Sequence, residues 1–247
     1  MTRNAGRDFM RNTCYDRMGP SQQELGLPQP PLELPVPEGA ELLALPAPQD
    51  IQIPPLDLRQ AIEQRKTWRK YREEPLTLEE FSFLLWCTQG IKTFTSRPVT
   101  FRTVPSAGAR HAFETYLLVN RVEGVQPGLY RYVASAHALQ PLSQDPGLPE
   151  RLVEVCLNQT KIARGAVSFF WVAVRERMYW RYGERGYRYL HLDAGHVCQN
   201  LYLAAEPLDC GVCGIAAFDD AGLNSALGLD GEDLFVVYAA SLGKKLR

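Results

Sequence analysis

The chain has 247 residues and a formal net charge of −1, and 45% of its residues are hydrophobic while 22% are charged. This length suits one large domain or two small ones, and the apolar content is too high for an intrinsically disordered chain. A net charge near zero also argues against a protein built to coat nucleic acid, which is usually basic. Two asymmetries stand out: ten of the 18 prolines lie in the first 55 residues, and Arg outnumbers Lys by 21 to 6.

No segment predicts a membrane span or an export signal. The longest strongly apolar run, from Gly165 to Val174, has ten residues, whereas a membrane-spanning helix needs about 20. The N-terminus carries the charged residues Arg3, Arg7 and Asp8 with no apolar stretch after them. We therefore expect a cytoplasmic protein whose cysteines are free thiols. These cysteines are Cys14, Cys87, Cys156, Cys198, Cys210 and Cys213.

The first region, residues 1–56, is rich in proline, which prevents a regular helix and disfavours central strands. Aliphatic side chains alternate with these prolines, among them Leu25, Leu32, Val36 and Ile51. A plain disordered linker would carry fewer such side chains. The composition predicts an extended arm that docks on a folded surface, followed by one domain over residues 57–247.

The rest of the chain predicts alternating helices and strands. A helical pattern begins at Leu56 and ends near Tyr71, and a capping box at Thr77 begins a second helix that runs through Trp86. Strands are expected over residues 113–122, 128–134, 138–142, 167–174, 211–218 and 234–242, and helices over 149–158, 186–205 and 219–227. The 186–205 helix has a buried stripe at three- and four-residue spacings, formed by Leu190, Ala194, Val197, Leu201 and Ala204. The pattern predicts an α+β fold.

The densest charge cluster is the run from Arg65 to Arg72, which holds five positive charges in eight residues. On a helix, Arg65 and Arg69 would share a face, and Thr67 adds a hydroxyl. Arginine binds phosphate oxygens at two points, which lysine does not do. The cluster is therefore either a solvated helix face or an anion site. Nucleic acid is a poor candidate for that anion, because no second basic segment lies nearby in the sequence.

A loop of small residues runs from Pro105 to His111 with the sequence Pro-Ser-Ala-Gly-Ala-Arg-His. Small side chains let backbone N–H groups approach a flat ligand or a phosphate closely. The loop is not a Walker loop, because no Gly-Lys-Ser/Thr follows it. By itself the loop is equally compatible with an ordinary turn.

Two further patterns favour structural roles. Cys210 and Cys213 form a CxxC that enters an apolar strand and has no second pair, so we expect buried structural thiols. His191 and His196 are five residues apart, which is about 140° around a helix, so they cannot chelate one metal ion together. No metal site is expected, and no GxGxxG fingerprint of a nicotinamide-binding Rossmann fold occurs.

Together these motifs resemble the nitroreductase-like superfamily of FMN-dependent oxidoreductases, and within it the SagB/ThcOx-type dehydrogenases. The resemblance rests on the basic cluster, the small-residue loop, and the segments at residues 127–132, 182–200 and 215–219, and it covers about residues 57–245. It implies a three-layer α+β fold with a mainly antiparallel central sheet and a long central helix. It also implies an intertwined homodimer with one FMN at each of two sites between the subunits.

The resemblance also implies roles for individual residues. The basic cluster would hold the FMN phosphate and ribityl chain, with Arg69 at the N1/O2 edge of the flavin ring. The small-residue loop would line one side of the ring, and the backbone of residues 215–217 would approach N5. Two lysines after the last strand would add charge near the phosphate. The cofactor-binding residues are thus Arg65, Lys66, Thr67, Arg69, Pro105, Ser106, Ala107, Ile215, Ala216, Ala217, Lys244 and Lys245.

Two departures from the family pattern bear on the reaction. Ala109 stands where many nitroreductases have Asn in this loop. The azoline-oxidising members deprotonate their substrate with a Lys-Tyr pair, and the nearest pair here is Arg181-Tyr182, in which the arginine stays protonated. We expect Tyr182 and Arg181 to be the catalytic, substrate-side groups, flanked by Arg185 and Arg188.

The resemblance implies an enzyme that passes hydride through flavin N5 to or from a small organic molecule or a modified peptide. One alternative is a general nitro or quinone reductase with NAD(P)H as a diffusible electron donor. Another is a flavin-binding scaffold, without catalysis, in a peptide-modifying complex. Neither a nucleic acid nor a membrane is expected as a partner. In the implied homodimer, we expect the proline-rich arm to pack on the partner subunit.

Overall fold

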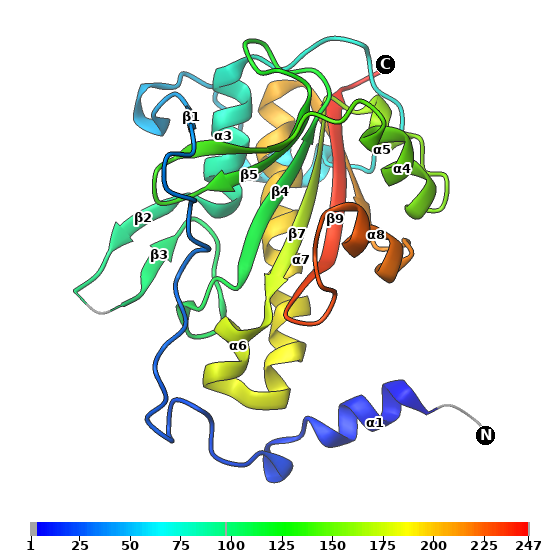
Figure 1. Cartoon of the computed structure of the whole chain (residues 1–247). Coiled ribbons are helices and arrows are strands. Elements are labelled where there is room, and N and C mark those ends of the chain that lie inside the picture. Colours follow the sequence, from blue (N-terminus) through cyan, green and yellow to red (C-terminus); the bar gives the residue numbers. More distant parts are fainter. Residues whose placement is uncertain (1–3, 97, 247) are drawn as a thin grey trace.

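The computed structural model describes residues 4–96 and 98–246, and a seven-stranded sheet forms its centre (Figure 1). The strand order is β1-β6-β5-β4-β7-β9-β8, and each described pairing in it is antiparallel. The strands are β1 (Leu43–Ala44), β4 (Phe113–Val119), β5 (Gly128–Val133), β6 (Ala138–Ser143), β7 (Val167–Val174), β8 (Cys210–Ile215) and β9 (Leu234–Lys244). A separate hairpin pairs β2 (Ile91–Phe94) with β3 (Thr100–Arg102). The expected mainly antiparallel sheet is confirmed.

Helices cover both faces of the sheet and make three layers (Figure 1). The helices α3 (Leu78–Gln89) and α7 (Gly186–Ala205) pack on one face, and α4 (Leu148–Val155), α5 (Lys161–Arg164) and α8 (Asp220–Ala226) pack on the other. Successive strand residues point to opposite faces. Leu117 therefore belongs to the core beneath α3 and α7, while its neighbour Leu118 belongs to the core beneath α4 and α8.

The central helix α7 has the expected bounds and the expected buried stripe, from Leu190 to Ala204. It follows α6 (Arg175–Tyr182), which begins directly after β7. The capping box at Thr77 is also present at the start of α3. Among the described residues, no helix combines the length and the apolar character that crossing a membrane requires. Single 3-10 turns lie at Tyr15–Arg17, Pro48–Asp50, Ala107–Ala109, Gly183–Arg185 and Glu206–Leu208.

The helix expected to end near Tyr71 is shorter than predicted. The helix α2 spans only Leu58–Gln64, and the basic segment that follows it runs extended beside β8. Thr67 forms a parallel bridge with Val212, and the amide of Trp68 donates to the Val212 carbonyl oxygen at 2.9 Å. Strand β8 is the edge of the sheet, and its unpaired backbone groups need partners. Pairing with this edge overrides the helical pattern of the basic segment.

The N-terminal region begins with a helix, α1 (Ala5–Asn12), which lies before the first proline and stands away from the body of the molecule (Figure 1). The expectation of no regular helix in residues 1–56 is therefore wrong at this point. After α1 the chain runs extended across the sheet and reaches β1, which pairs with β6.

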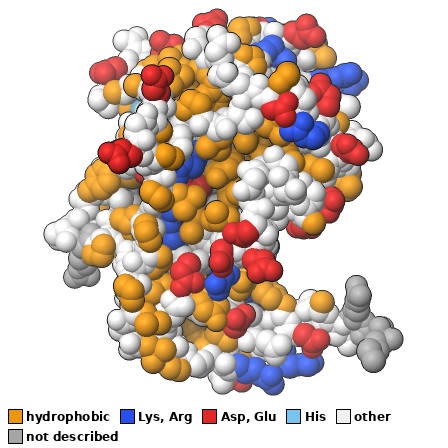
Figure 2. All heavy atoms as spheres, in the orientation of Figure 1, with side chains coloured by type: hydrophobic (Ala, Val, Ile, Leu, Met, Phe, Trp, Pro, Cys, Tyr) orange, Lys and Arg blue, Asp and Glu red, His pale blue; other side chains and the backbone are white. Residues whose placement is uncertain are grey.

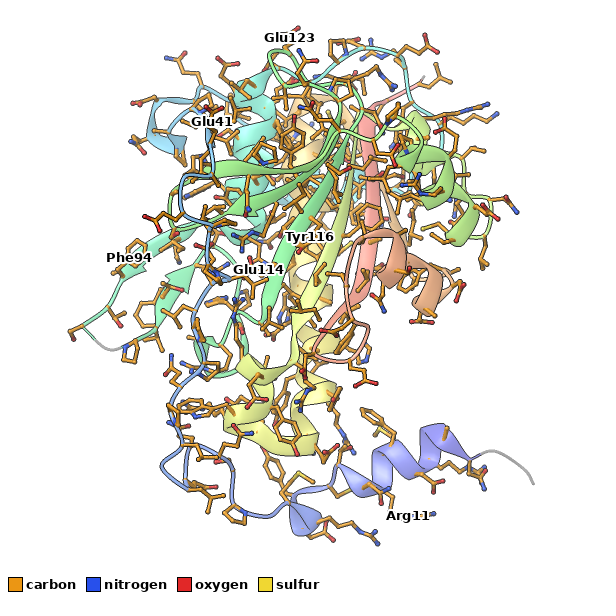
Figure 3. All side chains as sticks on the ribbon, in the orientation of Figure 1. Arg11, Glu41, Phe94, Glu114, Tyr116 and Glu123 are labelled. Carbon is orange, nitrogen blue, oxygen red and sulfur yellow. The ribbon has the colours of Figure 1, made fainter. Side chains whose placement is uncertain are left out.

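Arginine side chains hold the arm by its backbone carbonyls. Arg131 Nη1 donates to the Leu34 oxygen and Arg177 Nε to the Pro31 oxygen, both at 2.8 Å. A proline-rich extended chain forms no regular ladder, so its carbonyls need donors from elsewhere. Glu114 lies beside the arm (Figure 3) and accepts from the Leu34 amide and from Arg177 Nη2. The arm docks on its own chain, and its packing on a partner subunit remains a prediction.

Two arginines that we expected near the substrate bind the N-terminal segment. Arg185 Nη1 donates to the Thr13 carbonyl oxygen at 2.8 Å, and Arg188 Nε donates to the Thr13 hydroxyl at 2.5 Å. Part of the arginine excess in the composition therefore serves to hold the N-terminal region on the domain.

Candidate functional site

The basic segment presents three of its residues on one side. Side chains two apart in an extended chain point the same way, so Arg65, Thr67 and Arg69 alternate with Lys66 and Trp68. These three side chains point the same way because side-chain direction repeats every two residues in an extended chain. The sequence had suggested the three- and four-residue spacing of a helix instead. The Arg65 guanidinium lies 5.3 Å from the ring centre of Tyr202 on α7, and the hydroxyls of Thr67 and Tyr202 are 3.3 Å apart.

Arg72 of this segment pairs with Glu74 and Asp209, whereas the charges of Arg65 and Arg69 have no such partner in the described part of the chain. Within residues 4–96 and 98–246, no carboxylate forms an ion pair with Arg65 or Arg69. Lys66 lies over the ring of Trp68, with its Nζ 4.4 Å from the ring centre. Two guanidinium groups without ion pairs and the nearby Thr67 hydroxyl fit a phosphate group, because a phosphate binds best to cationic donors together with a neutral one.

The two lysines after the last strand are already paired. Lys244 Nζ contacts the Glu80 carboxylate and the Leu208 carbonyl oxygen, and Lys245 Nζ donates to Glu206 Oε2 at 2.7 Å. Both lysine residues are buried. These ion pairs disfavour the expected role of the two lysines beside a phosphate, because binding there would leave the buried Glu206 and the half-buried Glu80 unpaired.

A third cation near the basic segment, Lys161, was not among the expected site residues. Burial raises the pKa of the Cys213 thiol, while the nearby charges of Lys161 and Arg69 act in the opposite direction. Lys161 Nζ donates to Gln159 Oε1, and Gln159 Nε2 donates to the Ala217 carbonyl oxygen at 2.7 Å. Lys161 is therefore linked to the 215–217 segment at the end of β8. The sequence indicates only weakly that Lys161 belongs to a site: it is one of six lysines, and it stands before a buried strand.

The residues expected to approach N5 lie at the carboxyl end of β8. Ile215 is the last residue of this strand and is buried, while Ala216 and Ala217 are exposed. The amide of Gly214, just before them, donates to the Tyr202 hydroxyl at 2.9 Å. Tyr202 thus contacts both Thr67 and Gly214. It links the basic segment to the end of β8, where the exposed residues Ala216 and Ala217 begin.

The small-residue loop is anchored to the middle of α7. The Ser106 hydroxyl donates to Asp193 Oδ2 at 2.6 Å, and the Ala107 amide donates to Asp193 Oδ1 at 3.2 Å. Burial raises the pKa of Asp193, and these two hydrogen bonds partly offset that effect. Pro105 remains exposed at the start of the loop. Sequence reasoning missed Asp193 as an anchor, although a carboxylate three residues after Leu190 falls on the buried stripe.

The expected substrate-side groups lie over the same loop. A methyl group placed on Gly108, whose φ is +56°, would lie 2.4 Å from the Tyr182 hydroxyl and 2.8 Å from Arg181 Nε. The ring of Tyr182 packs edge-on against Tyr189, with the ring centres 4.7 Å apart. The structure therefore brings Arg181 and Tyr182 to the loop that the sequence assigned to the flavin ring.

The two groups of expected cofactor residues lie on opposite sides of α7. The basic segment contacts Tyr202, and the small-residue loop contacts Asp193. Nine residues separate these positions, which corresponds to about 13.5 Å along the axis and about half a turn around it. One chain therefore does not bring the two groups together.

The cysteines do not form a redox site. All six are free thiols, as expected, and both members of the CxxC are buried in β8. Burial raises the pKa of Cys210 to about 12. A thiol that stays protonated is a poor nucleophile, so the structure favours a packing role. In the part of the chain that the structure describes, no group of three His, Cys, Asp or Glu side chains is placed to hold a metal ion.

Comparison with known proteins identifies the family. The profile of the Nitroreductase family matches residues 62–244. The chain belongs to this family of oxidoreductases. The nitroreductase-family protein MJ1384 of Methanocaldococcus jannaschii is 35% identical over 181 residues, which cover 72% of this chain and 89% of that protein. FMN is the typical cofactor of the family.

Two larger relatives match over only part of their length. A nitroreductase structure from Anabaena variabilis has a TM-score of 0.65 and 32% identity, covering 77% of this chain and 38% of that chain. The trifolitoxin-processing protein TfxB of Rhizobium leguminosarum bv. trifolii is 30% identical over 133 residues, 52% of this chain and 36% of that protein. This chain therefore spans well under half of these two relatives.

Proposed function

We propose that the protein is an FMN-dependent oxidoreductase whose flavin site is completed by a second copy of the chain. The observation that carries the proposal is the separation of the two halves by α7, with uncompensated Arg65 and Arg69 on one side and the anchored loop on the other. In a homodimer, one subunit supplies the basic segment and its partner supplies the small-residue loop. Two equivalent sites result, as two-fold symmetry requires.

The residues of the basic segment fit the parts of FMN. Arg65 and Thr67 would hold the phosphate and ribityl chain, because Arg65 forms no ion pair within the described residues and Thr67 lies beside it on the segment. Arg69 and Lys161 would place positive charge near the ring, which favours the anionic reduced flavin. FMN, when bound, supplies hydride transfer at N5. The backbone of Ile215 to Ala217 would approach that atom without offering an acid or a base.

On the substrate side, the chain offers one group that can exchange a proton. The Tyr182 hydroxyl lies over Gly108 and can donate to a substrate atom or accept from it. A guanidinium group has no acceptor atom and is a poor general base, so Arg181 is unsuited to that role. We therefore assign Tyr182 to proton transfer and Arg181 to substrate positioning.

The first experiment tests whether FMN binds. The purified protein should be yellow and should release FMN on denaturation. Arg65→Gln should weaken FMN binding about tenfold or more, because it removes a charge-assisted contact to phosphate. Lys70→Gln, an exposed residue of the same segment, is the matched control and should bind FMN normally. A colourless protein that does not take up added FMN would contradict the proposal.

A second experiment tests whether each site is shared between subunits. Arg65→Gln and Gly108→Ala damage different halves of the site, so each variant alone should lose activity. After the two variants are mixed and allowed to exchange subunits, the mixed dimer has one intact site. If exchange is statistical, roughly a quarter of the wild-type activity should return. If both halves came from one chain, mixing would restore nothing.

The electron donor and the substrate need separate assays. Anaerobic reduction of the bound flavin by NADPH or NADH would support a nitro or quinone reductase, the activity that the name of the Methanocaldococcus relative suggests. Failure of both nucleotides, with reduction by an organic or peptide substrate, would support a dehydrogenase. The similarity to TfxB, whose name assigns it to trifolitoxin processing, supports including modified peptides among the substrates tested.

A further inference from the structure

A cavity of about 600 Å³ lies beside the small-residue loop. Three parts of the chain that are far apart in the sequence form its walls: the arm, the β2–β3 hairpin, and the loop together with α6. The side chains that matter here are Gln23, Gln29, Phe101, Arg110 and Arg181. Because Gly108 also lines it, the cavity is continuous with the surface that carries Tyr182.

The charged residues among the described lining residues are both arginines. Arg110 is only 3% exposed, and its Nε donates to the Gly108 carbonyl oxygen at 3.1 Å. In the described part of the chain, no carboxylate forms an ion pair with Arg110 or Arg181. Burial and the like charge of Arg181 lower the pKa of Arg110. The cavity therefore carries positive charge without an internal counter-charge.

The other buried arginines find partners on neighbouring elements. Arg131 and Arg177 share the carboxylate of Glu114, and Arg102 donates to Gln89 Oε1 at 3.2 Å. A buried cation without a partner lowers stability, so buried Arg110 next to half-buried Arg181 in one cavity favours an anionic ligand. Arg110 is held in place by Gly108 and by the ring of Trp180, whose centre is 5.4 Å from its guanidinium carbon.

We propose that this cavity binds the carboxylate of an acidic substrate, with Arg110 and Arg181 as the specificity-determining residues. The proposal rests on the proposed oxidoreductase function for turnover but not for binding. An arginine guanidinium matches a carboxylate with two parallel hydrogen bonds and keeps its charge at any working pH. Phe101, 52% exposed, offers an apolar wall for the rest of the substrate. This role also accounts for Arg181, which is unsuited to act as a base.

The test uses the full-length protein with bound FMN and two nitroaromatic probes of equal shape. 4-Nitrobenzoate carries a carboxylate, and 4-nitrobenzamide is its neutral counterpart. Wild-type protein should prefer 4-nitrobenzoate in kcat/KM by about tenfold, the size expected for one charge-assisted hydrogen-bonded pair. Arg181→Gln should abolish this preference, because it should lower kcat/KM for 4-nitrobenzoate about tenfold more than kcat/KM for 4-nitrobenzamide. Arg175→Gln, on the same helix but paired with Asp233 outside the cavity, should keep the preference.

A binding measurement separates this proposal from the flavin proposal. Calorimetric titration with 4-nitrobenzoate should show binding to wild-type protein and at least about tenfold weaker binding to Arg181→Gln, whether or not turnover occurs. Arg110→Gln should also weaken the binding of 4-nitrobenzoate. Arg110 is buried, so if Arg110→Gln fails to fold, the test still rests on Arg181→Gln. Equal binding of the two probes, or an effect of Arg181→Gln confined to the NADPH-over-NADH preference, would overturn the proposal.

Discussion

The hydroxyl of Ser106 donates to Asp193 Oδ2 at 2.6 Å, and this contact joins the small-residue loop to the central helix α7. The second oxygen of Asp193 accepts from the Ala107 amide, so one carboxylate fixes two consecutive loop residues. The loop is thus placed by a buried acid on a helix 20 residues long. The first prediction tests this anchor.

Asp193→Asn should weaken FMN binding by about tenfold, because an amide offers one acceptor oxygen where the carboxylate offers two. Ser106→Ala should have a similar or smaller effect. Ser225→Ala, an exposed position on α8, serves as the control. Fluorescence titration of flavin measures the affinity. Unchanged affinity in both loop variants would show that the loop does not contact the cofactor.

Gly108→Ala should reduce turnover far more than it reduces stability. The added methyl would meet the Tyr182 hydroxyl at 2.4 Å, so Tyr182 and Arg181 must move. Gly124→Ala is a matched control, because Gly124 also has a positive φ, +73°, but its added methyl would have no neighbour within 4 Å. Both variants should lose about 1 kcal/mol from backbone strain. Equal kcat in the two variants would exclude a role for Tyr182.

His111 should make stability depend on pH in the acidic range. Burial, the charge of Arg102 and the charge of Arg110 lower its pKa from 6.5 to about 3. Between these two pH values, His111 therefore binds a proton in the unfolded chain but not in the native state. His111 therefore does not lower the free energy of unfolding above about pH 6.5. As the pH falls toward 3, the free energy of unfolding decreases by up to about 1.4 kcal/mol per pH unit.

The measurement for His111 is urea unfolding between pH 4 and 7. His111→Asn should remove this part of the slope, and Asn tolerates the φ of +43° at this position. His191→Asn, an exposed histidine on α7, should leave the slope unchanged. An identical pH dependence in wild type and His111→Asn would show that His111 titrates alike in the folded and unfolded states.

Glu114→Gln should destabilise the protein strongly. Glu114 is the shared carboxylate of Arg131 and Arg177, and all three side chains are at most 3% exposed. Removing its charge leaves two buried cations unpaired, which should lower the free energy of unfolding by about 3 to 5 kcal/mol. Asp145→Asn breaks an exposed pair with Arg151 and should change the stability far less. Thermal unfolding compares the two variants.

The same substitution also tests how the arm is held. Glu114 Oε1 accepts from the Leu34 amide, so Glu114→Gln should increase trypsin cleavage after the exposed residue Arg17. A variant that unfolds more easily but is cut at the wild-type rate under native conditions would show that the arm docks independently of Glu114.

The face of the molecule that the arm crosses carries hydrophobic side chains as well as acidic and basic ones (Figure 2). Composition predicted an extended arm with aliphatic residues, but it did not indicate the arginines that hold it. Those arginines lie on β5, on α6, in the turn Gly183–Arg185 and on α7, far from the arm in the sequence. Their pairing with arm carbonyls depends on a surface that exists only in the folded chain.

Local signals in the sequence were sufficient for the elements that depend on near neighbours. The capping box at Thr77 and the stripe from Leu190 to Ala204 predicted α3 and α7, because caps and helical faces are set within a few residues. The order of motifs likewise identified the family. The residues that would hold FMN were proposed from that resemblance, and the flavin experiments above test them.

Tertiary structure decided what depends on distant segments. The basic segment after Arg65 is extended because the edge strand β8, far along the chain, offers it backbone hydrogen bonds that a helix would forgo. Lys244 and Lys245 are paired with carboxylates that no sequence pattern linked to them. By itself, the sequence determined the family, the strands β4 to β9 and the helices α3, α4, α7 and α8. The choice of partner for each charge was made by packing, because a buried charge is stable only beside a group that the fold brings to it.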